Sequence, residues 1–299
     1  MSEASAGPAP DFLVIGHVTK DLRPDGSFTI GGSATFASLT AQRLGLRAGI
    51  VTSAAPNLLA RLPEALPEIA VAAVPAAEST TFENSYEGGQ RRQYLRGRAA
   101  PLTPEHVPPA WRQARIVLLG PLAQEVAPAF ATAFPGALLG ATPQGWLRQW
   151  VADGLVSPTA WTSAPQVLPH LHALILSRED LIAHNSGNQQ QEQIEALLRD
   201  WQRATPMLAL TEGPRGATLY QAGRSRHFRA FPAREVDPTG AGDVFAAALL
   251  IQYALGQDAA AAMRFANCVA SFVVEQPGAL GIPTPAQVAT RLRRQRADD

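Results

Sequence analysis

The stretch that decides the fold is REVDPTGAGDVFAAALL, residues Arg234–Leu250. Pro238 and Thr239 end an extended segment, three small residues then allow a close turn, and an apolar helix begins at once. The first amides of a helix have no intrahelical acceptor and lie at the positive end of the helix dipole. The stretch therefore predicts a helix start that binds a phosphate group.

Within this stretch, the residues that would touch a phosphate are Gly240, Ala241 and Gly242, with Asp243 beside them. Their small size lets a phosphate approach the backbone, and a carboxylate at 243 can accept the proton of an attacking hydroxyl. An aspartate in the first turn of a helix is also favourable without any function, so the short string GAGD alone favours a structural role. The full string DPTGAGD, late in an α/β chain, is far more specific.

The rest of the chain alternates short apolar runs with helical patterns. This alternation predicts an α/β fold with a doubly wound, mostly parallel sheet and helices on both faces, as one domain over residues 1–299. Ligands of such sheets bind beyond the carboxyl ends of the strands. The predicted strands are Asp11–Gly16, Arg47–Ser53, Arg115–Gly120, Ala137–Gly140, Ala173–Leu176 and Met207–Thr211. The predicted helices are Ser33–Leu44, Gln190–Arg203, Gly240–Leu255, Ala259–Val274 and Thr284–Arg294.

Two segments, about 17–30 and 79–96, interrupt this alternation. The first is a polar insertion with an Asp25-Gly26 turn, and the second alternates polar with aromatic or β-branched residues around Gly88-Gly89. Both read as hairpins that project from the sheet. On pattern alone they are either surface hairpins or a small β lid over the ligand edge.

Composition excludes several classes of partner. The 299 residues include 25 basic and 25 acidic side chains, and a net charge of zero argues against binding to nucleic acid. We expect no membrane association, because the longest apolar stretch is too short to span a bilayer. The lone cysteine, Cys268, excludes a disulfide framework and favours a cytoplasmic setting.

Several common catalytic signatures are also absent from the sequence. Lys20, the only lysine, follows Thr19 where a P-loop requires glycine, which also excludes the strand-borne lysine of protein kinases. The chain contains no GxGxxG, GxSxG or HExxH string. Phosphate chemistry therefore depends on the helix start at Gly240.

These motifs resemble those of the ribokinase-like (PfkB) carbohydrate kinases, whose C-terminal signature has the form of DPTGAGD. The resemblance extends over most of the chain, and the strings GGSATF and REVDPTGAGD resemble the inositol-kinase-like branch more than ribokinase itself. The predicted hairpins fall where the family has its substrate-covering β layer. Further similar positions are the Gly31-Gly32 pair, Asp21 five residues after Gly16, the loop of Thr211, Gly213 and Gly216, and the Ala266-Asn267 pair.

The resemblance implies a role for each of these positions. Asp243 is the general base, and the amides of Gly240, Ala241 and Gly242 form an anion hole for the transferring phosphoryl group. Substrate hydroxyls bind at Asp21, Gly31 and Gly32. The nucleotide pocket is lined by Thr211, Gly213, Gly216, Asn267 and Ser177. The implied cofactors are ATP and Mg²⁺, with a monovalent cation as an open addition.

The sequence departs from the family pattern at two places. Where the family has N-x-x-E near the metal and phosphates, this chain has Ser177-Arg178-Glu179-Asp180. Asp180 and Asp237 are the candidate Mg²⁺ ligands, directly or through water. A sugar-contacting asparagine of many members aligns with Phe36, which indicates a flatter ligand face.

The expected function is ATP-dependent phosphoryl transfer to a hydroxyl of a small sugar, an inositol-like polyol or a nucleoside, with Asp243 as base. Two alternatives stay open. One is a non-catalytic sensor that binds a small molecule or nucleotide on the same fold, and the other is a kinase for a vitamin precursor of the hydroxymethyl-pyrimidine type. The protein is expected as a monomer or as a homodimer that pairs through the lid.

Overall fold

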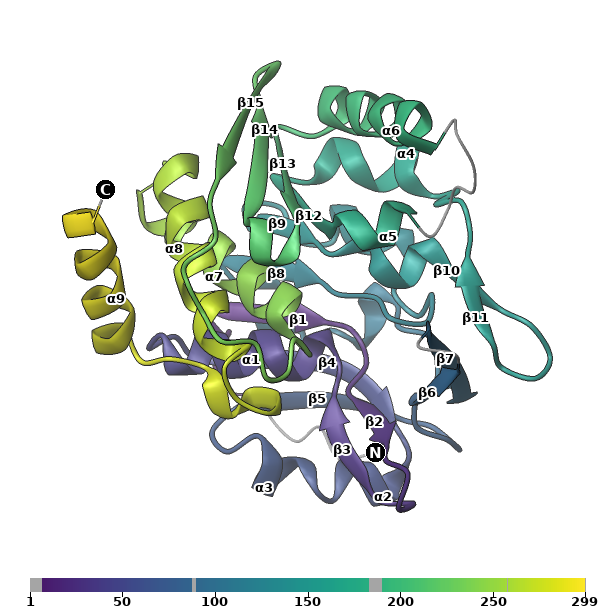
Figure 1. Ribbon diagram of the computed structural model, residues 1–299. Helices are drawn as coiled ribbons and strands as arrows, with labels where there is room; N and C mark the ends of the chain where they lie inside the picture. Colours follow the sequence, from purple (N-terminus) through teal and green to yellow (C-terminus); the bar gives the residue numbers. More distant parts are fainter. Residues whose placement is uncertain (1–6, 88–89, 183–189, 257, 299) are drawn as a thin grey trace.

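The structure is a computed structural model that describes residues 7–87, 90–182, 190–256 and 258–298. Its centre is one large twisted sheet (Figure 1). Across this sheet the strand order is β15 (Arg224–Phe228), β14 (Ala217–Gln221), β13 (Met207–Thr211), β12 (Ala173–Ser177), β9 (Leu138–Ala141), β8 (Ile116–Leu119), β1 (Phe12–Ile15), β4 (Ala48–Ala54) and β5 (Ala70–Pro75).

The strands from β13 to β5 run parallel, and only β14 and β15 are antiparallel to their neighbours. Each strand predicted from an apolar run is present within a few residues of its expected position. The mostly parallel sheet predicted from the sequence is therefore confirmed. Because all the parallel strands point the same way, their carboxyl ends meet at one edge.

Helices cover both faces of the sheet, as predicted. One layer contains α1 (Ser33–Arg43), α7 (Ala241–Gly256) and α8 (Ala259–Val273), and the other contains α4 (Ala164–Val167) and α6 (Gln190–Ala204). The remaining helices are α2 (Pro56–Leu59), α3 (Leu62–Ala65), α5 (Arg178–Ile182) and α9 (Pro285–Asp298). Among the described residues, no helix combines the length and apolar character that a bilayer span requires.

Alternation along β1 shows how the two layers are built. Phe12 and Val14 pack into the cluster under α1, α7 and α8, whereas Leu13 and Ile15 pack into the cluster on the opposite face. All four are fully buried. A strand covered on both faces must be apolar throughout, which is why the run read as a strand without polar alternation.

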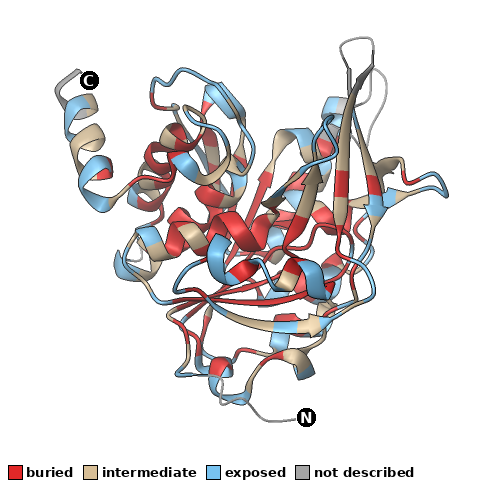
Figure 2. Cartoon of the chain, turned by 90° about the horizontal axis from the view of Figure 1, so that it is seen from below, coloured by how far each residue is buried: buried red, intermediate tan, exposed pale blue. Residues whose placement is uncertain are grey.

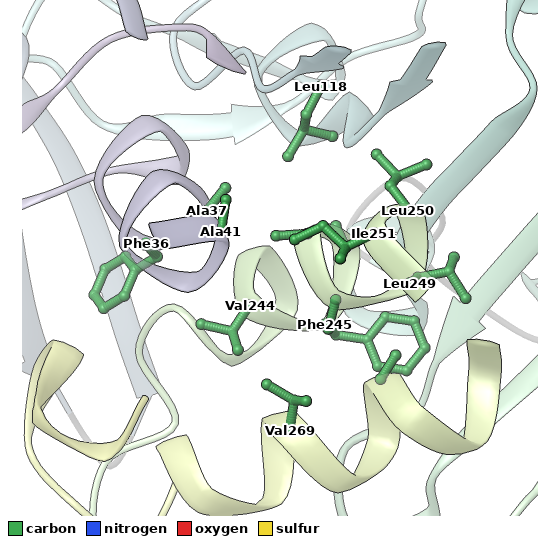
Figure 3. Close-up of a cluster of buried hydrophobic side chains, with 14 of the residues drawn as sticks. Phe36, Ala37, Ala41, Leu118, Val244, Phe245, Leu249, Leu250, Ile251 and Val269 are labelled. Carbon is green, nitrogen blue, oxygen red and sulfur yellow. The ribbon is translucent and has the colours of Figure 1, made fainter. Parts of the chain in front are cut away.

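Helix α7 has a long apolar stretch in the core, and Val244–Ile251 is buried without interruption. In Figure 3, Val244 lies between α1, marked by Phe36 and Ala37, and Val269 of α8, whereas the Phe245 ring packs over α8 on the side away from α1. Buried residues are concentrated in the central strands and helices, whereas α9 is largely exposed or intermediate (Figure 2). The helix that begins at the predicted phosphate site is thus held rigidly by the core.

A second, smaller sheet stands apart from the large one, with strand order β3 (Phe28–Gly31), β2 (Thr19–Leu22), β6 (Thr81–Glu87) and β7 (Gln90–Gly97). It contains both predicted hairpins, 17–30 and 79–96, although residues 88 and 89 lie outside the described part of the chain. Strands β2 and β6 pair in parallel and join the two hairpins. The separate small sheet that the sequence indicates is confirmed.

A short hairpin of β10 (Arg148–Trp150) and β11 (Val156–Pro158) forms a two-stranded sheet of its own and was not predicted from the sequence. It lies beside β7, where the Leu95 amide donates to the Gly154 carbonyl at 2.8 Å (Figure 1). Its strands are only three residues long, so they carry too little alternation to be recognised. A single turn of 3-10 helix, Pro143–Leu147, connects β9 to this hairpin, which therefore starts near the carboxyl edge of the large sheet.

Replacing Phe245 with alanine tests the importance of this core. Phe245 is 2% exposed, so its removal leaves a cavity between α7 and α8 and is expected to lower the free energy of unfolding by about 3–5 kcal/mol. Leu255→Ala on the same helix is the control, because Leu255 is 78% exposed, and its effect is expected to stay within about 0.5 kcal/mol. Urea unfolding monitored by circular dichroism measures both. Equal effects would contradict the burial of α7.

Candidate active site

The floor of the candidate site lies where β1 and β8 end and α1 begins. A methyl group built at Gly16 would lie 2.4 Å from the Gly120 carbonyl oxygen, and one built at Gly120 would lie 2.8 Å from Ser33 Cβ. Glycine is therefore required at both strand ends for α1 to approach the sheet edge. This close approach brings Ser33, 2% exposed, to the start of α7.

The start of α7 has the backbone shape expected of the predicted anion hole. Gly240 has φ of +78°, and a methyl group there would lie 2.3 Å from the Phe36 ring. Gly242 has open space around its Cα, and Ala241 begins the helix. The Ala241 amide donates to the Pro238 carbonyl at 3.2 Å, which closes the turn before the helix. Phe36, expected on a ligand face, is instead 4% exposed and supports Gly240 from below.

Asp243 lies in the first turn of α7, and the Ser33 hydroxyl hydrogen-bonds its carboxylate. Burial raises the pKa of Asp243 to about 6, although the Ser33 hydrogen bond acts in the opposite direction. The charge of Asp180 adds to the increase, the Arg148 guanidinium opposes it, and Asp21 adds a smaller increase. A carboxylate with such a pKa can accept a proton near neutral pH.

Ser33 and Arg148 are the residues of this site that sequence reasoning missed. Ser33 directly follows the Gly31-Gly32 pair, so its position next to a motif was the available signal. Arg148 is partly buried at the start of β10, and no local pattern distinguishes it from other arginines. It approaches Asp243 only because the segment after β9 turns across the sheet edge.

The residues predicted to bind the substrate hydroxyls come together on the small sheet. Asp21 on β2 lies so close to Gly31 on β3 that a methyl group at Gly31 would overlap its carboxylate. Thr19 donates to the Asp21 carboxylate at 3.1 Å. Gly32 has φ of +91° and precedes α1, so a side chain there would strain the backbone. Asp21 is near enough to Asp243 to influence its pKa.

The residues predicted to line the nucleotide pocket lie at the ends of β12 and β13. Thr211 ends β13, and its hydroxyl donates to the Leu176 carbonyl at 3.3 Å. Gly213, with φ of +59°, has open space around it, whereas Gly216 packs against the backbone at Phe228. The structure thus leaves Gly213 accessible and gives Gly216 a clear packing role.

Ser177 and Asp180 form a reciprocal cap at the start of α5. The Ser177 hydroxyl accepts from the Glu179 amide at 3.1 Å, and the Asp180 carboxylate accepts from the Ser177 amide at 3.1 Å. The other Asp180 oxygen accepts from the Gln144 side chain at 3.1 Å. The departure from N-x-x-E therefore retains a compact turn that holds a carboxylate near Asp243.

Asn267 and Asp237 both bind backbone groups. The Asn267 amide donates to the Phe228 and Arg229 carbonyls at 3.1 and 3.3 Å, which anchors the segment after β15 on α8. The Asp237 carboxylate accepts from the Thr239 and Gly278 amides at 2.9 and 3.0 Å. Asp237 thus shapes the turn that leads into α7.

The acidic residues suit a metal that is held mainly by phosphates. Within the described part of the chain, no group of three His, Cys, Asp or Glu side chains is arranged to hold a metal ion. Mg²⁺ commonly keeps several waters and uses one or two carboxylates together with substrate phosphates. Each of the two candidates accepts two hydrogen bonds, and Asp180 is the one that lies near Asp243.

A sheet of this order, a small second sheet and a helix start at the carboxyl edge define the ribokinase-like fold. A pyrophosphate-dependent kinase of the ribokinase family, solved with a pyrophosphate analogue and myo-inositol, superposes with a TM-score of 0.77. It shares 20% identity and covers 94% of this chain and 99% of its own. Arabidopsis thaliana ribokinase, solved with ribose and ATP, gives 0.69 at 19% identity, covering 95% and 99%. At these identities the likeness establishes the fold.

Comparison of sequences adds similarity to a protein family to the similarity of fold. Residues 144–286 match the pfkB family of carbohydrate kinases. Bacillus subtilis ribokinase is 43% identical over 82 residues, which are 27% of this chain, and Zea mays inositol 3-kinase is 30% identical over 141 residues, or 47%. These alignments span 28% and 34% of the two relatives. The segment 144–286 is therefore similar to the pfkB carbohydrate kinases, and the resemblance found in the sequence motifs is confirmed.

Replacing Asp243 with asparagine is expected to stabilise the protein at high pH. Because the folded-state pKa of Asp243, about 6, exceeds the ordinary value of 3.8, ionisation costs folding free energy that is absent below pH 3.8 and complete above pH 6. The variant should gain on the order of 1–2 kcal/mol at pH 8, and the gain should vanish near pH 4. Melting temperatures at both pH values measure this. Asp200→Asn, at a side chain 71% exposed, is the control and should show no such trend.

Proposed function

We propose that the protein is an ATP-dependent kinase that phosphorylates a hydroxyl of a small sugar, polyol or nucleoside, with Asp243 as the general base. The observation that supports this most directly is the position of the Asp243 carboxylate, beside the first amides of α7 and hydrogen-bonded by Ser33. Phosphoryl transfer requires positioning and charge stabilisation more than covalent participation by the protein. This helix start supplies both.

In the proposed reaction, Asp243 accepts the proton of the acceptor hydroxyl as its oxygen attacks the terminal phosphorus of the donor. The amides of Gly240, Ala241 and Gly242 donate hydrogen bonds to the oxygens of the transferring group. The Arg148 guanidinium offsets part of the charge that Asp180 and Asp243 concentrate at this edge. The bond between that phosphorus and the bridging oxygen of ATP breaks, and ADP departs toward the ends of β12 and β13.

We place the acceptor between the small sheet and the start of α1. Asp21 accepts from hydroxyls, and the Gly31 and Gly32 backbone allows close approach without side-chain obstruction. Among the charges that act on Asp243, the carboxylates of Asp21 and Asp180 outnumber the guanidinium of Arg148, so the site favours a neutral polyhydroxylated acceptor over an anionic one. The small sheet acts as the lid.

We place the donor along Ser177, Thr211 and Gly213, with Mg²⁺ held by its phosphates and by Asp180 through water. The magnesium ion would neutralise phosphate charge when bound. A structural neighbour uses pyrophosphate, and another was solved with ATP, so both donors belong in the test. Asn267 and Gly216 support this pocket by fixing the segment after β15.

The central test measures phosphoryl transfer from ATP and from pyrophosphate, each with Mg²⁺, across sugars, inositols, nucleosides and hydroxymethyl-pyrimidines. We expect acceptor-dependent turnover with ATP, and Asp243→Asn should lower kcat by roughly 10²–10⁴-fold, because it removes a general base. Asp200→Asn is the matched control and should leave turnover unchanged. Nucleotide binding without turnover on any acceptor would favour a sensor instead.

The pH dependence of kcat/KM provides a second test. Asp243 acts as a base only when ionised, so activity should rise with pH through the pKa of the free enzyme, about 6, and level off above it. We expect a single acidic limb, about tenfold in rate for each pH unit below that value. A rate that stays constant down to pH 4.5 would show that another group accepts the proton.

A further inference from the structure

We propose that Gln124 is a positioning residue that fixes the Arg148 end of β10 beside Asp243 and joins it to the small sheet. This inference rests on the proposed function, since it assigns a contribution to the same site. Its basis is a set of contacts among the loop 121–125, the segment 143–148 and the β7 end of the small sheet. The sequence motifs do not identify this loop.

Gln124 has an unusual backbone conformation for its residue type. Its φ is +56°, and among the described non-glycine residues only Glu68 and Ala222 share a positive φ. A long side chain in this region costs free energy that glycine would avoid. The side chain is exposed, so it does not compensate by packing. Its visible interaction is a hydrogen bond from the amide nitrogen to the Arg148 carbonyl.

The loop that carries Gln124 is held firmly from below. The Glu125 carboxylate is fully buried and accepts hydrogen bonds from the backbone amides of Ala123 at 2.7 Å, Leu122 at 2.9 Å and His17 at 3.1 Å. His17 begins the connection from β1 to the small sheet. Three charge-assisted hydrogen bonds make this loop a rigid support.

The segment before Arg148 rests on this support at a second point. The Gly145 amide donates to the Pro121 carbonyl at 2.9 Å, and a methyl group at Gly145 would lie 2.3 Å from the Leu122 amide nitrogen. Gly145 therefore lets the two backbones touch. The second attachment is at Arg148, three residues after Gly145, where the Gln124 side chain donates to the backbone carbonyl. The backbone from Gly145 to Arg148 is therefore fixed at both ends.

The same loop is joined to the small sheet through Arg98. The Arg98 guanidinium donates to the Ala123 and Gln124 carbonyls at 2.9 and 3.2 Å, and it also lies over the Trp150 ring of β10, 5.3 Å from the ring centre. Arg98 directly follows β7. The loop, β10 and the end of the proposed lid therefore form one connected unit.

Displacement of β10 would move a charge that acts on the proposed base. The Arg148 guanidinium lowers the pKa of Asp243 against the increase caused by burial and by Asp180. Coulomb interactions fall with distance, so a looser β10 weakens this effect and also misplaces the charge relative to the transferring phosphoryl group. Gln124 thus acts through Arg148 and does not touch substrate itself.

The test compares Gln124→Ala and Gln124→Gly with Gln149→Ala. Gln149 is the matched control, because its side chain donates to the Pro158 carbonyl within the same hairpin but does not attach it to the loop. We expect both Gln124 variants to lower kcat on the order of 10-fold, with KM for the acceptor nearly unchanged, as misplacement of a charged group implies. Glycine adopts a positive φ without strain, whereas alanine does not. An equal decrease of kcat in both variants would therefore identify loss of the side-chain amide hydrogen bond as the cause.

A double variant separates positioning from general destabilisation. If Gln124 acts through Arg148, Gln124→Ala in an Arg148→Gln background should cause no further loss of kcat. Full additivity of the two losses, or an equal loss in Gln149→Ala, would overturn the proposal. Thermal stability of each variant accompanies these rates.

Hydrogen exchange in the full chain gives a readout that does not require turnover. Gln124→Ala should accelerate exchange of amides in 148–158 while leaving those of β8 unchanged. Unchanged exchange in 148–158 would overturn the positioning role. If the wild-type protein shows no transfer to any acceptor, the proposed function fails, and the exchange measurement still decides whether Gln124 holds β10.

Discussion

The whole site depends on the crossing of two helix starts, where Gly240 packs against the Phe36 ring and Ser33 reaches Asp243. A side chain at Gly240 would push α7 away from α1, and its positive φ directs the following amides toward the sheet edge. The crossing also brings together distant parts of the chain, since α1 follows the small-sheet hairpin β2–β3 and α7 follows the edge strand β15. Burial of α7 in the core keeps this arrangement rigid, which matters because an anion hole acts through fixed dipoles.

Much of the fold could be predicted because its signals are local. Continuous apolar runs revealed the buried parallel strands, and turn residues between polar alternations revealed both hairpins of the small sheet. The strands that were not predicted lack a recognisable sequence pattern for a physical reason. Strand β15 (Arg224–Phe228) is almost entirely exposed, and β5 (Ala70–Pro75) is an edge strand with intermediate or exposed residues, so neither shows a buried face. The strands β10 and β11 are held by pairing with each other and by contact with β7, which no sequence window contains.

The same distinction applies to the site. Asp243, the three small residues before it, and the Gly31-Gly32 pair could be located because each belongs to a short motif with its own backbone requirement. Arg148 and Gln124 could not, because their importance arises from the way the loops after β8 and β9 meet at one edge. Phe36 illustrates the limit of positional reasoning: the residue aligned with a ligand-facing asparagine turns into the core and packs against Gly240, at the proposed anion hole.

The pair Ser177 and Asp180 shows how a departure from a motif can preserve its geometry. Shorter side chains reach less far, yet here the Asp180 carboxylate accepts from the Ser177 amide and the Ser177 hydroxyl accepts from the Glu179 amide. This turn at the start of α5 holds a carboxylate within electrostatic range of Asp243. That carboxylate raises the pKa of Asp243, whereas Arg148 lowers it. A base that was fully protonated at neutral pH could not accept a proton, and one with an ordinary carboxylate pKa would be a weaker acceptor. The opposing charges on α5 and β10 therefore tune the same carboxylate, and the loop that fixes β10 belongs to the chemistry of the site.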